Sequence, residues 1–324
     1  MNALLLAGFI LACFLLTVRL GGLVCAYAGR RWEQSLARSS KRSAALALLP
    51  LALGVAVALS IVPISALVGA CHCLSHPHHL HLCFEHAGFS WSLVTVVLAG
   101  LLALSFALVE LSVLLAQFVR THRWLQAAAR PSEQRAGIAV ALSKALGMRA
   151  VTAGLVKPRV VIGEALWTKL SADQREAVVA HEHAHAVRRD PMTLLVLSVV
   201  ACLMPKSAGS LVTAWRRAAE LACDAEAADA IGDRFTLADA LVTCGRLQLA
   251  EQGSAPRGAL AAAEPKDLEF RVKCLLDRAV PPSYASGGDL LRASAALLLV
   301  VLLTSLVVGP AAHHTIETLL EWTV

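Results

Sequence analysis

Two histidines and a glutamate form the pattern in this sequence with the clearest chemistry. His181, Glu182 and His185 match H-E-x-x-H, which on a helix supplies two zinc ligands and a carboxylate base. Ser171 and Gln174 form a capping box, and strong helix formers follow them, so the pattern is expected to lie on a helix. Because residues four apart share one helix face, both histidines can bind the same metal ion.

A catalytic zinc ion needs a third protein ligand and one open position for water. His183 does not qualify, because it points away from the face that His181 shares with His185. Glu220 and Asp224 lie four apart in a second segment of helical composition. We expect Glu220 to be the third ligand and Asp224 to orient a ligating imidazole through its free N–H group.

Chain geometry agrees with this assignment if Pro205 marks a chain reversal. The stretch from His185 to Pro205 spans about 30 Å as a helix, and the stretch from there to Glu220 spans about 22 Å, so the two ligand segments return to nearly the same level. The apolar run 192–204 is shorter than a normal membrane span and is expected to be a buried or re-entrant helix. The alternatives are a chance match to H-E-x-x-H and two solvated surface acids at Glu220 and Asp224.

A second group of metal-binding residue types lies in the segment 71–91. Six of the twelve histidines and three of the nine cysteines fall within it. This density of imidazoles and thiols suits copper or zinc, whereas the alternative is a polar loop whose cysteines form a disulfide. The residues concerned are Cys71, His72, Cys73, His76, His78, His79, His81, Cys83 and His86.

The composition excludes most soluble classes of protein. Hydrophobic residues make up 57% of the chain and charged residues only 16%, with a mean hydropathy of +0.65. Aromatic residues are only 5%, which is typical of membrane helices and not of an outer-membrane barrel. The net charge of +6 comes mainly from basic residues beside apolar stretches, so we read it as a topology signal and expect no direct nucleic-acid binding.

Four stretches are long enough to cross a hydrocarbon core of about 30 Å, which takes about 20 helical residues. They are residues 3–28, 44–70, 92–118 and 290–309. Glu110 lies within the third stretch, and because a carboxylate is costly in lipid we expect it to face other helices.

Charge asymmetry sets the orientation of these helices. The segment 30–42 is rich in arginine and lysine whereas 71–91 has neither, so by the positive-inside rule the first loop is cytoplasmic and the second is outside. The amino terminus is then also outside. The expected organisation is three transmembrane helices within 1–118 with an extracytoplasmic loop at 71–91, a cytoplasmic domain at 119–289, a fourth transmembrane helix at 290–309 and a short extracytoplasmic tail at 310–324.

These residues resemble a known family, the membrane metallopeptidases of the BlaR/MecR antirepressor type, which are gluzincin-like zinc proteases. The resemblance covers roughly residues 157–228. It rests on Lys-Pro-Arg-Val-Val-Ile-Gly at 157–163, on the H-E-x-x-H segment followed by Arg-Arg-Asp at 188–190, and on Glu-Leu-Ala-Cys-Asp at 220–224.

The resemblance implies a mainly α zinc peptidase domain with a small β element. In it His181, His185 and Glu220 bind zinc, and Glu182 is the general base. It also implies that Pro158–Gly163 is an edge strand beside which an extended substrate lies. Nothing in the sequence identifies the residue that stabilises the oxyanion, for which Arg271 is one candidate.

Together these observations predict an α-helical, multi-pass protein of the bacterial inner membrane whose zinc endopeptidase domain cleaves a cytoplasmic protein. By resemblance the substrate is a winged-helix transcriptional repressor, and the segment 71–91 makes transition-metal ions the expected cue. The chain ends about fifteen residues after the last span, so we expect no penicillin-binding sensor domain. The alternatives are a housekeeping quality-control protease and a non-catalytic metal-binding receptor.

Overall fold

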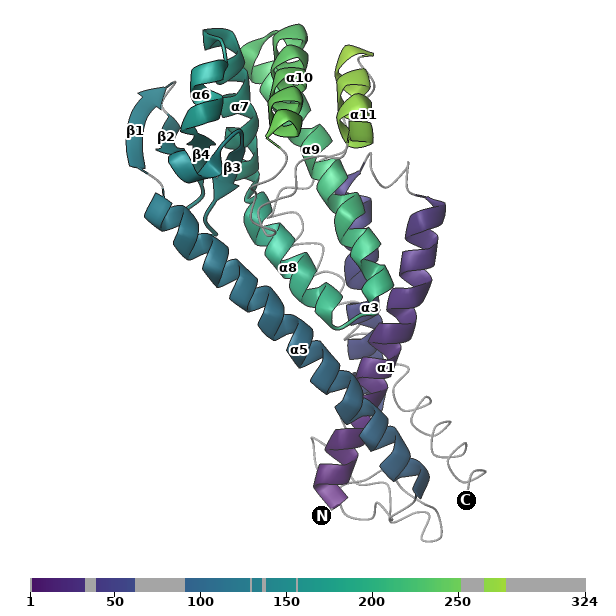
Figure 1. The fold of residues 1–324 in the computed structure, drawn as a ribbon. Coiled ribbons are helices and arrows are strands. Elements are labelled where there is room, and N and C mark those ends of the chain that lie inside the picture. The colour runs from purple at the N-terminus through teal and green to yellow at the C-terminus, as the bar shows by residue number, and fades with distance from the viewer. Residues whose placement is uncertain are drawn as a thin grey trace.

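Three long apolar helices dominate one half of the molecule. The computed structural model describes residues 2–32, 39–61, 91–128, 130–135, 138–155, 157–251 and 265–277. The helices α1 (Asn2–Arg31), α3 (Ser40–Ile61) and α5 (Trp91–Ala128) are each long and apolar enough to cross a membrane (Figure 1). The predicted fourth span at 290–309, the tail at 310–324 and the nine metal-binding residues of the loop lie outside the described residues.

The third of these helices is longer than the predicted span. It continues past residue 118 to Ala128, and its 38 residues give a length of about 57 Å, well beyond the thickness of a bilayer core. It leads almost directly into a small sheet, so the predicted domain boundary between 118 and 119 falls inside a continuous helix.

The sheet has four strands in the order β1-β2-β4-β3. They are β1 (Arg130–Arg135), β2 (Ile138–Ser143), β3 (Ala150–Ala153) and β4 (Arg159–Gly163), and β2 pairs with β4 in parallel while the other pairs are antiparallel. The expectation of an edge strand at Pro158–Gly163 is wrong, because β4 lies between two neighbours. The edge on that side of the sheet is β3.

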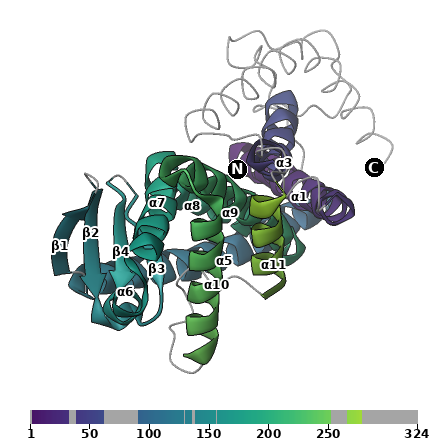
Figure 2. The ribbon, with the colours of Figure 1, turned by 90° about the horizontal axis from the view of Figure 1, so that it is seen from above.

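The remaining elements are helical, and the first two of them along the chain pack beside the sheet (Figure 2). Val160 and Ile162 of β4 form a core with apolar residues such as Leu166, Val178 and Leu237. The helices are α6 (Glu164–Lys169), α7 (Ala172–Arg188), α8 (Asp190–Cys202), α9 (Gly209–Ile231), α10 (Arg234–Ala250) and α11 (Pro265–Leu276), with short 3-10 turns η2 (Lys144–Leu146) and η3 (Lys206–Ala208).

The two helices α8 and α9 form a hairpin that packs against the membrane helices. A chain reversal at Pro205 and η3 joins them, as the sequence predicted. Leu197 and Trp215 from the two arms share a buried core with Val18 of α1 and Ala44 of α3. The apolar run at 192–204 is therefore one arm of a hairpin that packs against α1 and α3, and the chain returns to the level from which it came (Figure 1).

The close crossing of α1 and α5 depends on a glycine. A Cβ atom added at Gly100 would overlap the Ala12 side chain and lie 2.6 Å from its Cα. We expect Gly100→Ala to destabilise the fold by about 1–3 kcal/mol, because backbone must move to relieve the overlap. Thermal unfolding in detergent measures this effect. The control is Gly209→Ala, where an added Cβ meets nothing within 4 Å, and an equal melting temperature for both variants would contradict the prediction.

Candidate active site

The helix that carries the H-E-x-x-H pattern begins as the sequence predicts. The Ser171 side chain accepts a hydrogen bond from the Gln174 backbone N–H, and Gln174 accepts one in return from the Ser171 N–H. The inner face of α7 is buried, and the exposed fractions are only 6% for His181 and 8% for Glu182. The pattern is therefore held inside the protein, against the sheet and α9.

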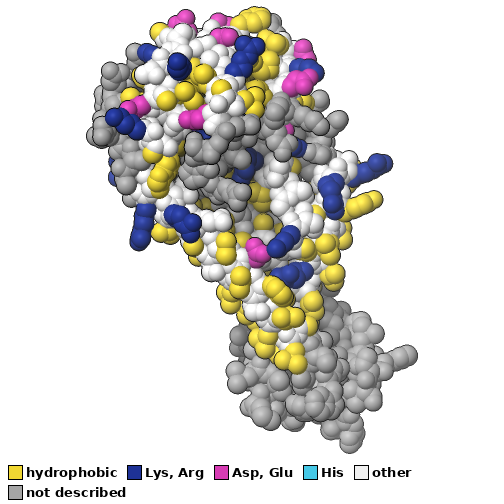
Figure 3. Space-filling view, viewed as in Figure 1, with side chains coloured by type: hydrophobic (Ala, Val, Ile, Leu, Met, Phe, Trp, Pro, Cys, Tyr) yellow, Lys and Arg dark blue, Asp and Glu magenta, His cyan; other side chains and the backbone are white. Residues whose placement is uncertain are grey.

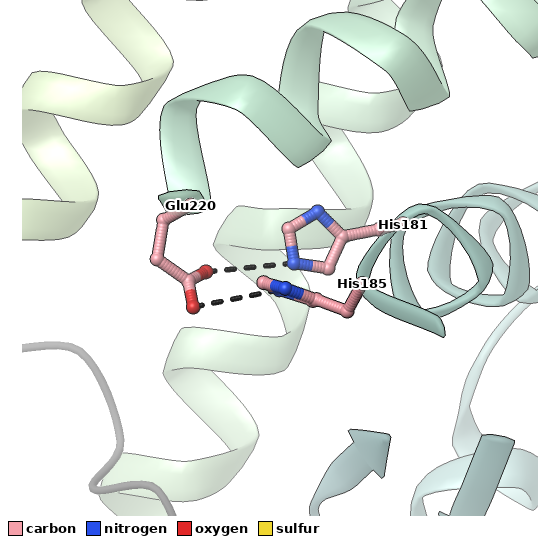
Figure 4. Close-up of side chains that lie close together, drawn as sticks. All are labelled: His181, His185 and Glu220. Carbon is pink, nitrogen blue, oxygen red and sulfur yellow. Dashed lines mark ion pairs between the residues drawn. The ribbon is translucent and has the colours of Figure 1, made fainter. Parts of the chain in front are cut away.

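Glu220 of α9 meets both histidines of α7 (Figure 4). Its two carboxylate oxygens lie 3.5 Å from His181 Nε2 and 3.5 Å from His185 Nε2. The three ligand atoms all lie within 4.8 Å of one another. The structure thus brings together the three side chains that the sequence singled out as a ligand set.

This donor set fits a zinc ion. Ligand atoms about 2.0–2.2 Å from a tetrahedral zinc are separated by about 3.4 Å, close to the 3.5 Å between Glu220 and each imidazole. Two neutral imidazoles and one carboxylate are a common catalytic zinc set. The ring nitrogen atoms of His181 and His185 and the carboxylate oxygen atoms of Glu220 converge on one point (Figure 4).

A separate carboxylate holds each imidazole from behind. Asp224 Oδ1 lies 3.0 Å from His181 Nδ1, and Asp190 Oδ2 lies 2.8 Å from His185 Nδ1. A proton on Nδ1 is thereby favoured in both rings, so a metal bound at the common point would meet the Nε2 lone pair of each ring. The position expected for Asp224 is found, whereas Asp190 was not singled out by the sequence analysis.

A tight turn between α7 and α8 places Asp190. Arg189 adopts a left-handed conformation with φ 56° and ψ 39°, which ends α7 and starts α8 at once. The turn places the Asp190 side chain against His185, which lies five residues earlier in the chain. Only the Arg-Arg-Asp segment noted in the resemblance pointed to this position, and nothing in it assigned a role.

Arg271 reaches the site from α11. Its Nε and Nη2 atoms donate to Asp224 at 2.7 and 2.6 Å, and its Nη1 atom lies 2.8 Å from Glu220. All three nitrogens of the guanidinium are thus engaged by the two acids. The interpretation of Arg271 as an oxyanion donor is therefore not supported, and the side chain instead positions Glu220 and Asp224.

The charges around the site raise the pKa of His181 and lower the pKa of Glu220. Burial by itself lowers the pKa of His181, but the carboxylates of Asp224 and Glu220 outweigh it and raise this pKa to about 10. Burial raises the pKa of Glu220, but the Arg271 guanidinium and the histidines outweigh it and hold this pKa well below the usual range. Glu220 is therefore ionised near neutral pH and available as an anionic ligand.

Glu182 is held by an edge strand. The Thr152 hydroxyl of β3 lies 2.6 Å from the Glu182 backbone oxygen and 2.9 Å from its carboxylate Oε2. Beside it, a cavity of about 420 Å³ lies between β3 and the helices α7, α9, α10 and α11. Its lining includes Ala150, Thr152 and Glu182 together with the three converging ligands. Sequence reasoning missed Thr152, because only the folded sheet brings it to the helix.

A second group of ligand types adjoins the first. His185, Asp190 and Cys223 also lie within 4.8 Å of one another. The Arg188 guanidinium, however, lies 3.3 Å from the same Asp190 oxygen, where it would repel a cation. This group is better described as support for the His185 ring, whose Nδ1 lies 3.2 Å from the Cys223 sulfur.

Removing the charge of Asp190 tests this support. We expect Asp190→Asn to lower the affinity for zinc about tenfold, since partners that orient ligating histidines contribute 10–100-fold. Competition with a chromophoric chelator measures the affinity. The exposed Asp173 in the first turn of α7 provides the control Asp173→Asn. Equal affinities of the two variants would show that Asp190 does not support the ligand.

A match to a known protein family supports the interpretation of these residues as a metallopeptidase site. The sequence model of the BlaR1 peptidase M56 family matches residues 83–275, which is more than half of the chain and includes α5 and every residue of the site. No curated protein and no solved structure was found to match. Three apolar helices, a converging set of metal-binding side chains and this match lead to one conclusion: the chain belongs to the BlaR1 peptidase M56 family of membrane metallopeptidases.

Proposed function

We propose that this protein is a zinc endopeptidase that cleaves a protein substrate on the cytoplasmic side of the bacterial inner membrane. The observation that carries the proposal is the convergence of His181, His185 and Glu220, with Glu182 beside them and a cavity in front. Zinc is the metal of choice because two imidazoles and one carboxylate match its preference.

Each side chain has a defined task in the proposed reaction. Zinc bound by the three ligands would polarise the scissile carbonyl and lower the pKa of a bound water. Glu182 accepts a proton from the attacking water and later donates it to the leaving amine. Thr152 holds the Glu182 carboxylate in place, and Asp224 and Asp190 hold the two imidazoles.

The edge strand offers a place for the substrate backbone. Among the described residues, no strand pairs with the outer side of β3, and its residues line the cavity next to Glu182. An extended peptide that adds to a sheet edge gains backbone hydrogen bonds whatever its sequence. We infer that the substrate binds along β3, in place of the strand predicted from the sequence.

The distribution of basic residues supports a cytoplasmic location. Arg30 and Arg31 end α1, Lys41 begins α3, and Arg120 and Arg123 lie in the part of α5 nearest the sheet. Figure 3 shows most of the basic side chains in the upper half of the molecule, and mainly hydrophobic side chains on the narrower described part below it. By the positive-inside rule, the sheet and the helices α7 to α11 face the cytoplasm.

Within this proposal, the substrate is a winged-helix transcriptional repressor and the cue is a transition-metal ion. The resemblance to antirepressor peptidases supports the first part. The histidines and cysteines at 71–86 support the second through their composition, although they lie outside the described residues. Copper or zinc bound there would be a second metal, distinct from the catalytic one.

New protein amino termini in cells test both parts at once. Cells with the intact protein are compared with cells carrying Glu182→Ala, each with and without added copper or zinc. We expect termini that require Glu182 and appear only with metal, and they identify the substrate directly. The exposed Glu176 on the same helix provides the control Glu176→Ala, which should behave as the intact protein.

The other outcomes separate the alternatives. Glu182-dependent termini from many membrane proteins, formed without added metal, would favour a quality-control protease. Identical termini in all strains would remove the support for an endopeptidase and favour a non-catalytic metal receptor.

A further inference from the structure

A second cavity of about 420 Å³ lies between α1, α5 and the tip of the α8–α9 hairpin. Four charged side chains line it: Arg19, Glu110, Lys206 and Arg216. Arg19 and Glu110 belong to two of the helices that are apolar enough to span a membrane. Charged side chains are rare in such helices, and where they occur they usually mark a functional site.

The charges of this cavity do not balance. Lys206 Nζ lies 3.6 Å from Glu110 Oε1, and no other carboxylate lines the cavity within the described part of the chain. Arg216 also interacts electrostatically with Glu220 of the neighbouring cavity, whereas Arg19 has no such counterpart in the lining. The Nε atoms of Arg19 and Arg216 are buried and have no hydrogen-bond partner among the described residues. Arg19 uses a different nitrogen, Nη2, to donate to the Ala103 carbonyl at 3.1 Å. An anion in the cavity would satisfy these donors and the excess positive charge.

An apolar surface continues from the cavity along α5. Leu102, Phe106, Val109 and Val113 lie on one face of this helix, and each is exposed over about half of its surface or more. Phe106 also lines the cavity. Figure 3 shows charged side chains set among hydrophobic ones in this part of the molecule. The site therefore pairs a cationic pocket with a strip that suits hydrocarbon.

We propose that this cavity binds the phosphate head group of an anionic phospholipid, with its acyl chains along the exposed face of α5. A free phosphate ion would use only the cationic half of the site, whereas a phospholipid uses both halves. Arg216 and Thr213 line this cavity and also the catalytic one, so a bound head group lies directly next to the peptidase site.

Native mass spectrometry of the full-length protein in detergent tests the proposal. Phosphatidylglycerol, phosphatidylcholine and inorganic phosphate are added separately, and the fraction of lipid-bound protein is measured. We expect tighter binding of phosphatidylglycerol than of phosphatidylcholine. Lys206→Gln and Arg216→Gln should each weaken phosphatidylglycerol binding about fivefold, the contribution of one basic residue at an anionic membrane surface.

The controls keep the result specific. Arg120→Gln removes an exposed basic residue of α5 outside the cavity and should leave lipid binding unchanged. The Lys206 side chain is 93% exposed, so its replacement removes charge without disturbing packing, even if Arg216→Gln fails to fold. Equal binding of both lipids, or no effect of Lys206→Gln, would overturn the proposal. Displacement of the lipid by millimolar inorganic phosphate would assign the cavity to a soluble anion instead. None of these readouts depends on peptidase activity.

Discussion

Glu182→Gln is expected to lower kcat by about a thousandfold while the protein keeps its full zinc content. A glutamine cannot accept the proton of the attacking water, and general acid–base catalysis contributes about 10²–10⁴-fold to rate. Glu182 does not belong to the ligand set, so the site that holds the metal stays intact. The amide can still accept the Thr152 hydrogen bond, so packing is preserved.

Cleavage of a fluorogenic peptide library and zinc per chain, measured on the same purified sample, check this expectation. The control is Glu176→Gln, an exposed acid of the same helix. Loss of zinc together with activity would make Glu182 a ligand, and retained activity would require a different base.

Glu220→Ala is expected to lower zinc affinity by more than about a hundredfold, beyond the range for residues that merely orient a ligand. The variant removes one of three ligands and leaves two imidazoles facing an empty position. It also removes a partner of Arg271, although Asp224 still holds that guanidinium through two hydrogen bonds. Activity should be lost because the metal is lost.

Zinc per chain after dialysis and melting temperature with and without zinc measure the effect. Zinc should raise the melting temperature of the intact protein, since a ligand that binds only the folded state stabilises it, and should leave that of Glu220→Ala unchanged. Asp229→Ala removes an acid of the same helix that is 76% exposed on its side chain and serves as the control. Zinc bound at one ion per chain in Glu220→Ala would refute the assigned ligand set.

The parts of the site that depend on helix capping, helix periodicity and chain spacing could be predicted from the sequence. The capping box and helix periodicity placed His181 and His185 on one face, and the spacing about Pro205 brought Glu220 to their level. Asp190 depended on a left-handed residue that is not glycine, which no sequence rule favours.

Long-range contacts could not be predicted in the same way. Thr152 and Arg271 reach the site from an edge strand and from α11, and no periodicity links either of them to α7. The wrong edge strand has a simple physical cause. Val160, Val161 and Ile162 are a continuous apolar run, which is typical of a strand covered on both faces and flanked on both sides. The fourth span and the metal-binding loop stay predictions.

The hairpin of α8 and α9 connects the long apolar helices to the converging ligand residues, because α9 packs against α1 and α3 and also carries Glu220. The tip of the hairpin packs closely against Gly22 of α1, where an added Cβ would lie 3.1 Å from Met204 and Pro205. Glu220 lies further along α9, which is one continuous helix. Sliding α9 by the rise of a single residue would move that carboxylate about 1.5 Å, several times the roughly 0.2 Å that a coordination bond tolerates. A displacement of α9 relative to α7 would therefore separate Glu220 from His181 and His185 and dismantle the ligand set.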